Sequence, residues 1–261
     1  MDKTYRIGFL DSGVGGLSVL ACAKGFIHNA EYIYYADTDH VPYGTKSHGE
    51  IISYVDSAMH FFLSRNVDAV LIACNTATSI AAGIMREKYN FKIIGMEPAL
   101  KPAAEKHGDG NILVCATQVT ITGKKMHDLV EATGVSPDLV ALPELVTFAE
   151  NGVFDKETVG VYLDKAVPEH EKYSAVVLGC THFTYFRRIF EESFPNAEII
   201  DGNIGAVRRL ASLMDIPLSE SCIPADDRTE YVISGRKVTE PDLINAFRSY
   251  EQRAAEYYTG L

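Results

Sequence analysis

Residues 69–76 read AVLIACNT and residues 175–182 read AVVLGCTH. Each stretch is an apolar run that ends in a cysteine and continues into polar residues, as expected of a buried strand followed by a turn. Cys74 and Cys180 are 180 − 74 = 106 residues apart. The same offset takes Asp11, at the end of the run IGFL, to Thr117, just after the run ILVC. The sequence therefore predicts a weak internal duplication with one cysteine in each half.

Apolar runs and stretches with helical spacing alternate along the chain. The apolar runs predict buried strands at residues 6–10, 31–35, 69–73, 92–95, 111–115, 139–142, 175–178 and 198–200. Helical spacing predicts helices at residues 50–66, 79–89, 124–133 and 156–166. This alternation predicts an α/β fold of two pseudo-symmetric domains with mainly parallel sheets. The chain is expected to cross between the halves at Glu97-Pro98, and ligands are expected at the carboxyl ends of the strands, in the cleft between the domains.

The composition disfavours several classes of protein. The 261 residues are 47% hydrophobic, which supports one large core or two modest ones. No apolar run approaches the roughly 18 residues of a membrane span, and MDKTYRIGFLDSG lacks the layout of a signal peptide, so we expect a cytoplasmic protein. A net charge of −11 argues against nucleic-acid binding. Five scattered cysteines without a C-x-x-C pair argue against a disulfide framework or a structural zinc site.

The two matched cysteines are the strongest candidates for chemistry. A thiol at the end of a strand and the start of a helix lies where the helix dipole stabilises a thiolate and a bound carboxylate. Two thiols in equivalent places of two facing halves can address opposite faces of one carbon. Racemisation needs that geometry, because one base removes the α-proton and a conjugate acid on the other face returns one. The remaining cysteines are interpreted as structural, and these are Cys22, Cys115 and Cys222.

Each candidate thiol has a possible proton-transfer partner. Asp11 ends the first strand and is expected near Cys74, and His182 lies two residues after Cys180. The glycines that follow Asp11, in SGVGG, allow close approach of the backbone to a ligand. They do not form a dinucleotide fingerprint, because the third glycine of G-x-G-x-x-G would fall on Ser18.

Two other cysteine chemistries fit the spacing less well. A phosphatase-like loop needs an arginine six positions after its nucleophile, where this chain has Ile80 and Phe186. A cysteine hydrolase needs a Cys–His pair with an orienting third group. Cys180 and His182 imitate such a pair, but that interpretation leaves Cys74 without a role.

Six segments together resemble the glutamate racemase family. They are IGFLDSGVGGLSVL, YYADTDHVPYGTKS, LIACNTATS, EPALKPA, LVCATQVT and VVLGCTHF, in family order and at family-like spacing between residue 7 and about residue 183. The resemblance implies two α/β domains, at residues 1–97 plus 208–261 and at residues 98–207. It also implies cofactor-independent interconversion of L- and D-glutamate, without pyridoxal phosphate, metal or nucleotide, in a homodimer that supplies D-glutamate for peptidoglycan in a bacterial cytoplasm.

The resemblance also carries over site residues where the motifs match. Cys74 and Cys180 would be the catalytic thiols, assisted by Asp11, His182 and Glu150. The implied substrate contacts are Ser12, Pro42, Tyr43, Gly44, Asn75, Thr76, Thr117, Thr120 and Thr181. Hydroxyl, amide and backbone N–H groups of this kind hold carboxylates without a bulky cation.

The chain departs from the family pattern at three places. ALPELVTFAENG replaces the common CPLFVPLVEEG but keeps Glu150, and Met126 stands where a tyrosine is usual. The first strand starts within about six residues of Met1, so we expect none of the N-terminal extension that binds an activator in some members. Two alternative functions remain open: a racemase for aspartate or another amino acid, and a non-catalytic relative that binds an acidic amino acid.

Overall fold

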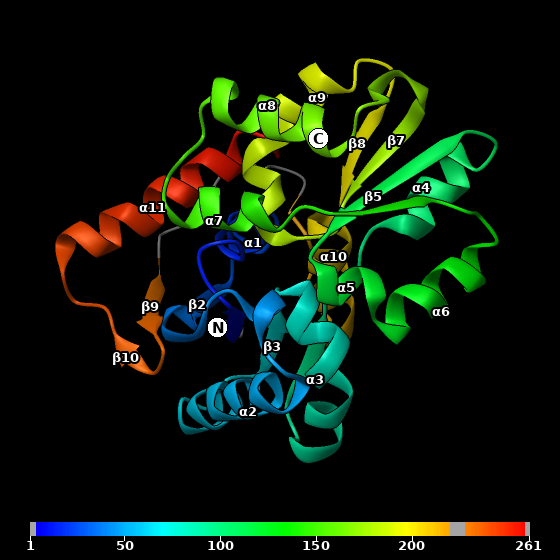
Figure 1. Cartoon of the computed structure of the whole chain (residues 1–261). Helices are drawn as coiled ribbons and strands as arrows, with labels where there is room; N and C mark the ends of the chain where they lie inside the picture. Colours follow the sequence, from blue (N-terminus) through cyan, green and yellow to red (C-terminus); the bar gives the residue numbers. More distant parts are fainter. Residues whose placement is uncertain (1–3, 220–227, 259–261) are drawn as a thin grey trace.

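The strands form two sheets in the part of the chain that the computed structural model describes, residues 4–219 and 228–258 (Figure 1). The first sheet has six strands in the order β10-β9-β2-β1-β3-β4, and the second has four in the order β6-β5-β7-β8. The strands are β1 Tyr5–Asp11, β2 Ala30–Ala36, β3 Ala69–Ile72, β4 Lys92–Gly95, β5 Asn111–Ala116, β6 Asp138–Ala141, β7 Tyr173–Leu178, β8 Glu198–Asp201, β9 Thr229–Ile233 and β10 Arg236–Lys237. Every strand pair is parallel except β9 and β10. The predicted α/β class with mainly parallel sheets is confirmed.

Helices connect the strands, as right-handed crossovers of parallel sheets require. The α-helices are α1 Leu17–Phe26, α2 His48–Ser64, α3 Asn75–Lys88, α4 Leu100–His107, α5 Gln118–Thr122, α6 Lys124–Thr133, α7 Pro143–Glu150, α8 Lys156–Ala166, α9 Arg187–Ser193, α10 Asn203–Met214 and α11 Pro241–Ala255. Four 3-10 helices are η1 Thr38–His40, η2 Tyr43–Thr45, η3 His170–Lys172 and η4 Thr181–Phe186. Among these described helices, none is long and apolar enough to cross a bilayer.

The two sheets repeat one arrangement of strands. The order β2-β1-β3-β4 in the first sheet recurs as β6-β5-β7-β8 in the second. The offset of 106 residues takes Lys92–Gly95 to residues 198–201, because 92 + 106 = 198 and 95 + 106 = 201, and β8 spans Glu198–Asp201. We call the first sheet with its helices the first half and the second sheet with its helices the second half. The proposed boundaries at residues 97/98 and 207/208 stay a prediction.

Alternating side chains on each strand pack against different helices. In β1, Ile7 and Phe9 join the core formed with α1, α10 and α11, whereas Leu10 joins the core formed with α2 and α3. In β5, Leu113 and Cys115 face α7, α8 and α9, and the alternate residues face α4 and α6. Both sheets are therefore covered on both faces, which explains why their strands read as continuous apolar runs.

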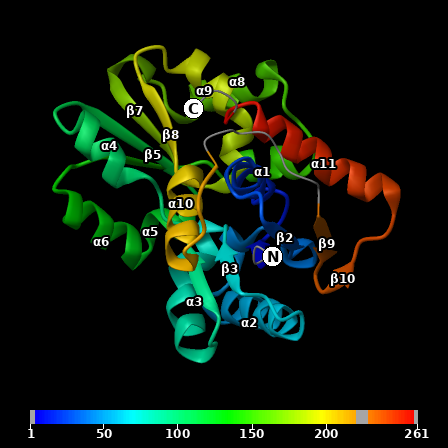
Figure 2. The same cartoon turned by 180° about the vertical axis from the view of Figure 1, so that it is seen from behind.

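The end of the chain returns to the first half. Figure 2 shows α10 leading away from β8 toward the first sheet, where it packs against β3 and β4. β9 then pairs with β2, and α11 packs on α1. The strands β9 and β10 were not among the predicted ones, because TEYVISGRK at this sheet edge has only three consecutive apolar residues, Tyr231 to Ile233, between polar ones.

Candidate active site

A cavity of about 60 Å3 lies between the two halves. The carboxyl ends of β1, β3, β5 and β7 all point toward it, as expected for parallel sheets. It is lined by Ser12, Pro42, Tyr43, Gly44, Thr45, Cys74, Asn75, Thr76, Thr117, Gln118, Pro143, Val146, Cys180, Thr181 and His182. Both candidate thiols therefore reach the same cavity, one from each half.

Cys74 lies at the end of β3 and caps helix α3. Its Sγ accepts a hydrogen bond from the Ala77 N–H at 3.4 Å. Helix α3 begins at Asn75, four residues before the predicted start at Ser79, because the polar residues after Cys74 form its first turn. The free N–H groups and positive dipole end of α3 therefore face the cavity beside this thiol.

Cys180 lies at the end of β7 in a different local structure. Both cysteines lie at the start of a helix, as expected, but Cys180 precedes the short 3-10 helix η4 instead of an α-helix. Cys180 Sγ lies 3.7 Å from His182 Nδ1. On the far side of the ring, His182 Nε2 is 2.6 Å from Glu150 Oε1, which forms a chain of three groups that ends at the cavity.

Asp11 is fully buried and joins the halves from behind the cavity. Its Oδ1 accepts from the Gly13 N–H at 3.0 Å, and its Oδ2 accepts from the Thr181 hydroxyl at 3.1 Å. A Cβ added to Gly13 would lie 1.8 Å from Glu150 Oε1, and one added to Gly15 would lie 2.4 Å from His182 Nδ1. Both positions require glycine because the second half packs directly on this loop.

Burial raises the pKa values of two titratable groups of the first half, Cys74 and Asp11. Burial raises the pKa of the Cys74 thiol to about 12, and the nearby Asp11 carboxylate adds to the effect. Burial also raises the pKa of Asp11 to about 6. Cys74 is therefore a neutral thiol at neutral pH, and Asp11 titrates close to neutrality, where a proton-transfer group is most effective.

The second-half groups form a charged pair. Burial alone would lower the pKa of His182, but its hydrogen bonds with Cys180 and Glu150 raise it well above the usual value. Burial would raise the pKa of Glu150, yet the hydrogen bond with His182 lowers it. An imidazolium and a carboxylate therefore lie behind Cys180, and Glu150 is fixed further by the Val14 N–H at 2.9 Å.

Polar groups suited to a carboxylate line the side of the cavity near α3 and α5. The hydroxyls of Thr76 and Thr117 are 2.8 Å apart, and that of Thr117 donates to Thr120 at 3.0 Å. The side chain of Asn75 is buried, and neither its Oδ1 nor its Nδ2 has a hydrogen-bond partner among the residues that the structure describes. A buried amide without partners is costly, so this side chain indicates where a polar ligand binds. Nowhere in residues 4–219 and 228–258 do three His, Cys, Asp or Glu side chains gather in a way suited to a metal ion.

A model of the Asp/Glu/hydantoin racemase family matches residues 18–210 of the chain. The chain belongs to this racemase family. The family resemblance inferred from the six motifs is confirmed.

Named members of the racemase family are similar over most of the chain. The glutamate racemase of Halothermothrix orenii is 47% identical over 214 residues, which are 80% of this chain and 85% of the relative. That of Campylobacter concisus is 42% identical over 92% of this chain and 93% of its own length. A solved structure of Escherichia coli glutamate racemase, in complex with L-glutamate and the activator UDP-MurNAc-Ala, matches with a TM-score of 0.79 at 26% identity. That match covers 95% of this chain and 96% of the other.

Most of the site residues predicted from the racemase motifs line the cavity itself. Three of the predicted residues do not: Asp11 and Glu150 lie behind Thr181 and His182, and Thr120 lies behind Thr117. Met126 is buried in a smaller hollow that also contains Thr120. Of the three cysteines interpreted as structural, Cys22 and Cys115 are fully buried, and Cys222 lies outside the described residues.

Four cavity residues were not predicted. Thr45 and Gln118 directly follow the predicted Gly44 and Thr117, so widening each motif by one residue would have included them. Pro143 and Val146 belong to the divergent LPELV segment at the start of α7. Their position depends on how α7 packs between the halves, and no single-sequence signal reports that packing.

Proposed function

We propose that the chain interconverts L- and D-glutamate with Cys74 and Cys180 as the two acid/base groups. The observation that carries this proposal is the shared cavity, which both cysteines reach from opposite halves. Membership of the racemase family and the 42% to 47% identity to named glutamate racemases support glutamate as the substrate.

The proposed reaction is a balanced exchange of protons. One cysteine, as the thiolate, takes the α-proton, so that the C–H bond breaks and an S–H bond forms. The other cysteine, as the thiol, gives its proton to the opposite face of the same carbon. The charge that develops meanwhile is stabilised by oriented hydroxyl and N–H groups in a site that excludes water. After one turnover the two sulfurs have exchanged protonation states.

Each partner group would reset its own cysteine. With its pKa of about 6, Asp11 can accept a proton on the Cys74 side and release it near neutral pH. On the Cys180 side, His182 is in contact with the sulfur and can pass a proton to or from it. Glu150 would hold the ring in place and stabilise its positive charge. The three groups thus divide into one assisting group for Cys74 and a pair for Cys180.

The substrate carboxylates would bind on the α3 side and on the wall formed by Pro42, Tyr43 and Gly44. Asn75 supplies an unpartnered buried amide, and Thr76 and Thr117 supply hydroxyls. The N-terminus of α3 adds free N–H groups and a positive dipole end, which favour a carboxylate. The remaining implied contacts, Ser12 and Thr181, lie on the same cavity.

The wider role would be the supply of D-glutamate for peptidoglycan by a homodimer in a bacterial cytoplasm. Two alternatives are tested together with the substrate: a racemase for aspartate or another amino acid, and a binding protein without activity. The observation behind both alternatives is the altered LPELV segment, which places Pro143 and Val146 on the cavity wall.

The deciding experiment is to incubate the purified chain, without added cofactor, with L-glutamate and separately with L-aspartate. We expect loss of optical rotation with glutamate only. In D2O, deuterium should appear at the α-carbon, first in the inverted product. Turnover of aspartate alone would identify the chain as an aspartate racemase. Inactivity on both amino acids with retained binding would support the non-catalytic alternative.

A further inference from the structure

We propose that Asp37 is a positioning residue for the substrate pocket, acting through Tyr43. The inference rests on the proposed function, because it concerns the wall of the same cavity. Asp37 directly follows β2, at the same edge of the first sheet as Asp11 and Cys74, but it does not line the cavity. Its side chain is only 3% exposed.

The carboxylate of Asp37 collects three hydrogen bonds behind the cavity wall. The Tyr43 hydroxyl donates to Oδ2 at 2.6 Å, and the Ser234 hydroxyl donates to Oδ1 at 3.0 Å. His40 Nδ1 lies 2.9 Å from both oxygens. A buried carboxylate is stable only when its oxygens are satisfied in this way, so these contacts fix its position.

Tyr43 transmits that position to the cavity. Its ring is 1% exposed and lines the cavity, while its hydroxyl points back to Asp37. Burial raises the pKa of Tyr43, and the Asp37 carboxylate raises it further, so the phenol keeps its proton and remains the donor. The next residue, Gly44, lies against the second half, since a Cβ added there would be 3.4 Å from the Thr117 Cβ. The position of this wall therefore sets the space between the halves.

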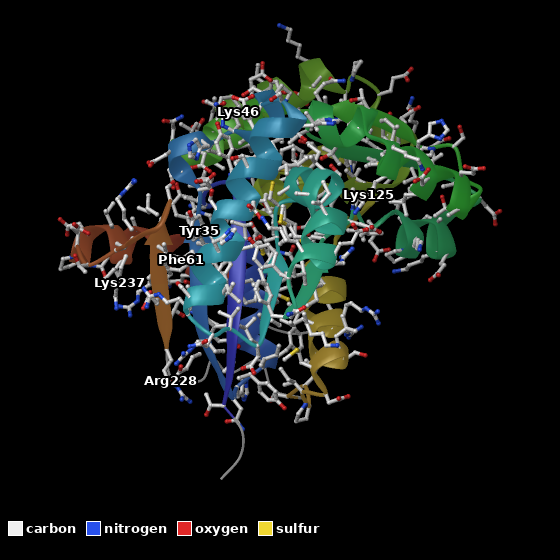
Figure 3. The ribbon with its side chains drawn as sticks, turned by 90° about the horizontal axis from the view of Figure 1, so that it is seen from below. Tyr35, Lys46, Phe61, Lys125, Arg228 and Lys237 are labelled. Carbon is white, nitrogen blue, oxygen red and sulfur yellow. The ribbon has the colours of Figure 1, made fainter. Side chains whose placement is uncertain are left out.

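The hydrogen bonds of Asp37 also involve the returning end of the chain. Ser234 begins the turn after β9, and its hydroxyl accepts from the Asp39 N–H at 3.1 Å as well as donating to Asp37. Arg236 makes a two-pronged ion pair with Asp39 at 2.7 and 2.9 Å, but this exposed pair lies outside the three hydrogen bonds of Asp37. Figure 3 shows the strands near Lys237 lying alongside the strand that carries Tyr35, the two residues being labelled. On the other side, the His40 ring stacks on Tyr54 at 3.8 Å.

Because Asp37 touches neither thiol nor cavity, its loss should weaken substrate binding more than proton transfer. The test compares Asp37→Asn, Tyr43→Phe and the double variant for kcat and KM with glutamate. We expect each single variant to raise KM roughly tenfold, the scale of one hydrogen bond to a charged group, with kcat within about threefold of wild type. The double variant should be no worse than about twofold beyond either single, because both break the same contact.

Asp39→Asn is the matched control. It removes the same charge from the same loop, but its carboxylate faces the exposed Arg236, and we expect KM within about twofold of wild type. Ser234→Ala should give an intermediate rise, since it removes one of the three hydrogen bonds. If Asp37→Asn proves unstable, Tyr43→Phe still decides, because it deletes one oxygen and keeps the ring.

Several results would overturn the inference. One is a lowered melting temperature in Asp37→Asn with unchanged KM, which would make the contact merely structural. Others are equal KM changes in Asp39→Asn, or multiplication of the two single effects in the double variant. Calorimetric measurement of the Kd for glutamate in the same variants tests the predicted loss of binding without relying on turnover. Failure of wild type to racemise glutamate would therefore count against the proposed function alone.

Discussion

The two halves share a strand order but supply their cysteines with different partners. Cys74 caps a long α-helix and has the buried carboxyl group of Asp11 nearby. Cys180 precedes a 3-10 helix and is backed by the ion pair of His182 and Glu150. The duplicated strand order therefore places the two thiols in equivalent positions, while the titratable groups around them differ.

This difference teaches that position and protonation are set by separate parts of the sequence. The strands fix where each sulfur lies. His182, two places after Cys180, and Glu150 at the end of α7 are the titratable groups beside that sulfur. On the Cys74 side the first turn of α3 carries Asn75 and Thr76 and no titratable group, and the nearby titratable side chain is Asp11 of β1.

The largest expected effect comes from breaking the pair itself. Cys74→Ala and Cys180→Ala should each lower racemisation by roughly 10³-fold or more, because each removes the acid/base group on one face. In D2O each variant should still exchange the α-proton of one enantiomer, and the two variants should act on opposite enantiomers. NMR of the α-proton measures this. Cys115→Ala, a buried thiol away from the cavity, is the control, and a similar loss of activity there would contradict the assignment.

The next effect sharpens the division of labour between the partners. Asp11→Asn and His182→Asn should each lower kcat/KM by roughly 10²-fold. That loss is equal in both directions, since L- and D-glutamate have the same free energy. The primary isotope effects with 2-deuterated L- and D-glutamate should shift in opposite senses in the two variants, because each slows the step at its own cysteine. His170→Asn, away from the cavity, is the control. Identical shifts in both variants would rule out separate roles.

A third effect concerns stability, and its pH dependence should differ in sign between the halves. Folding raises the pKa of Asp11 from 3.8 to about 6, so the folded state holds this proton more tightly and loses stability as pH rises from about 4 to about 6. This rise in pKa corresponds to about 3 kcal/mol. As pH rises over this range, the free energy of unfolding of Asp11→Asn should therefore increase relative to that of wild type, and above this range the difference should stay constant. Thermal unfolding measures it.

Glu150 gives the opposite case. Its pKa is lowered in the folded state, so it adds stability above its unfolded pKa and loses that contribution as pH falls. Glu150→Gln should be less stable than wild type at neutral pH, and the gap should close in acid. A gap that stayed constant from neutral pH to well below 4.5, the ordinary pKa of a glutamate, would show that the His182 contact does not lower the pKa of Glu150.

Much of the fold could be predicted because buried parallel strands leave a strong signal. The eight predicted strands all lie within two residues of their observed bounds, and the offset between the cysteines also relates β4 to β8. The strand-end rule is also why Asp11, Cys74, Cys180 and His182 could be expected at one cleft; the structure places the two cysteines and His182 on the cavity and Asp11 behind Thr181. Their catalytic roles stay predictions.

Other features depend on packing that a single sequence does not encode. The 3-10 helix after Cys180 arises where six buried residues, Thr181 to Phe186, are packed against the other half. The β9–β10 hairpin pairs at a sheet edge, where the apolar pattern is weakest. Asp37 follows a predicted strand and so satisfied the strand-end rule, but its partner Ser234 is 197 residues away.

The hydrogen bond between Thr76 and Thr117 spans the two halves directly. A ligand carboxylate that accepts a hydrogen bond from either hydroxyl must replace the bond between the two threonines. The binding free energy then contains only the difference between the new hydrogen bond and the one that is lost. Such a swap keeps ground-state binding modest. In a racemase the product differs from the substrate only in handedness and must dissociate from the same cavity. When it dissociates, the two threonines can form their hydrogen bond with each other again, which favours release.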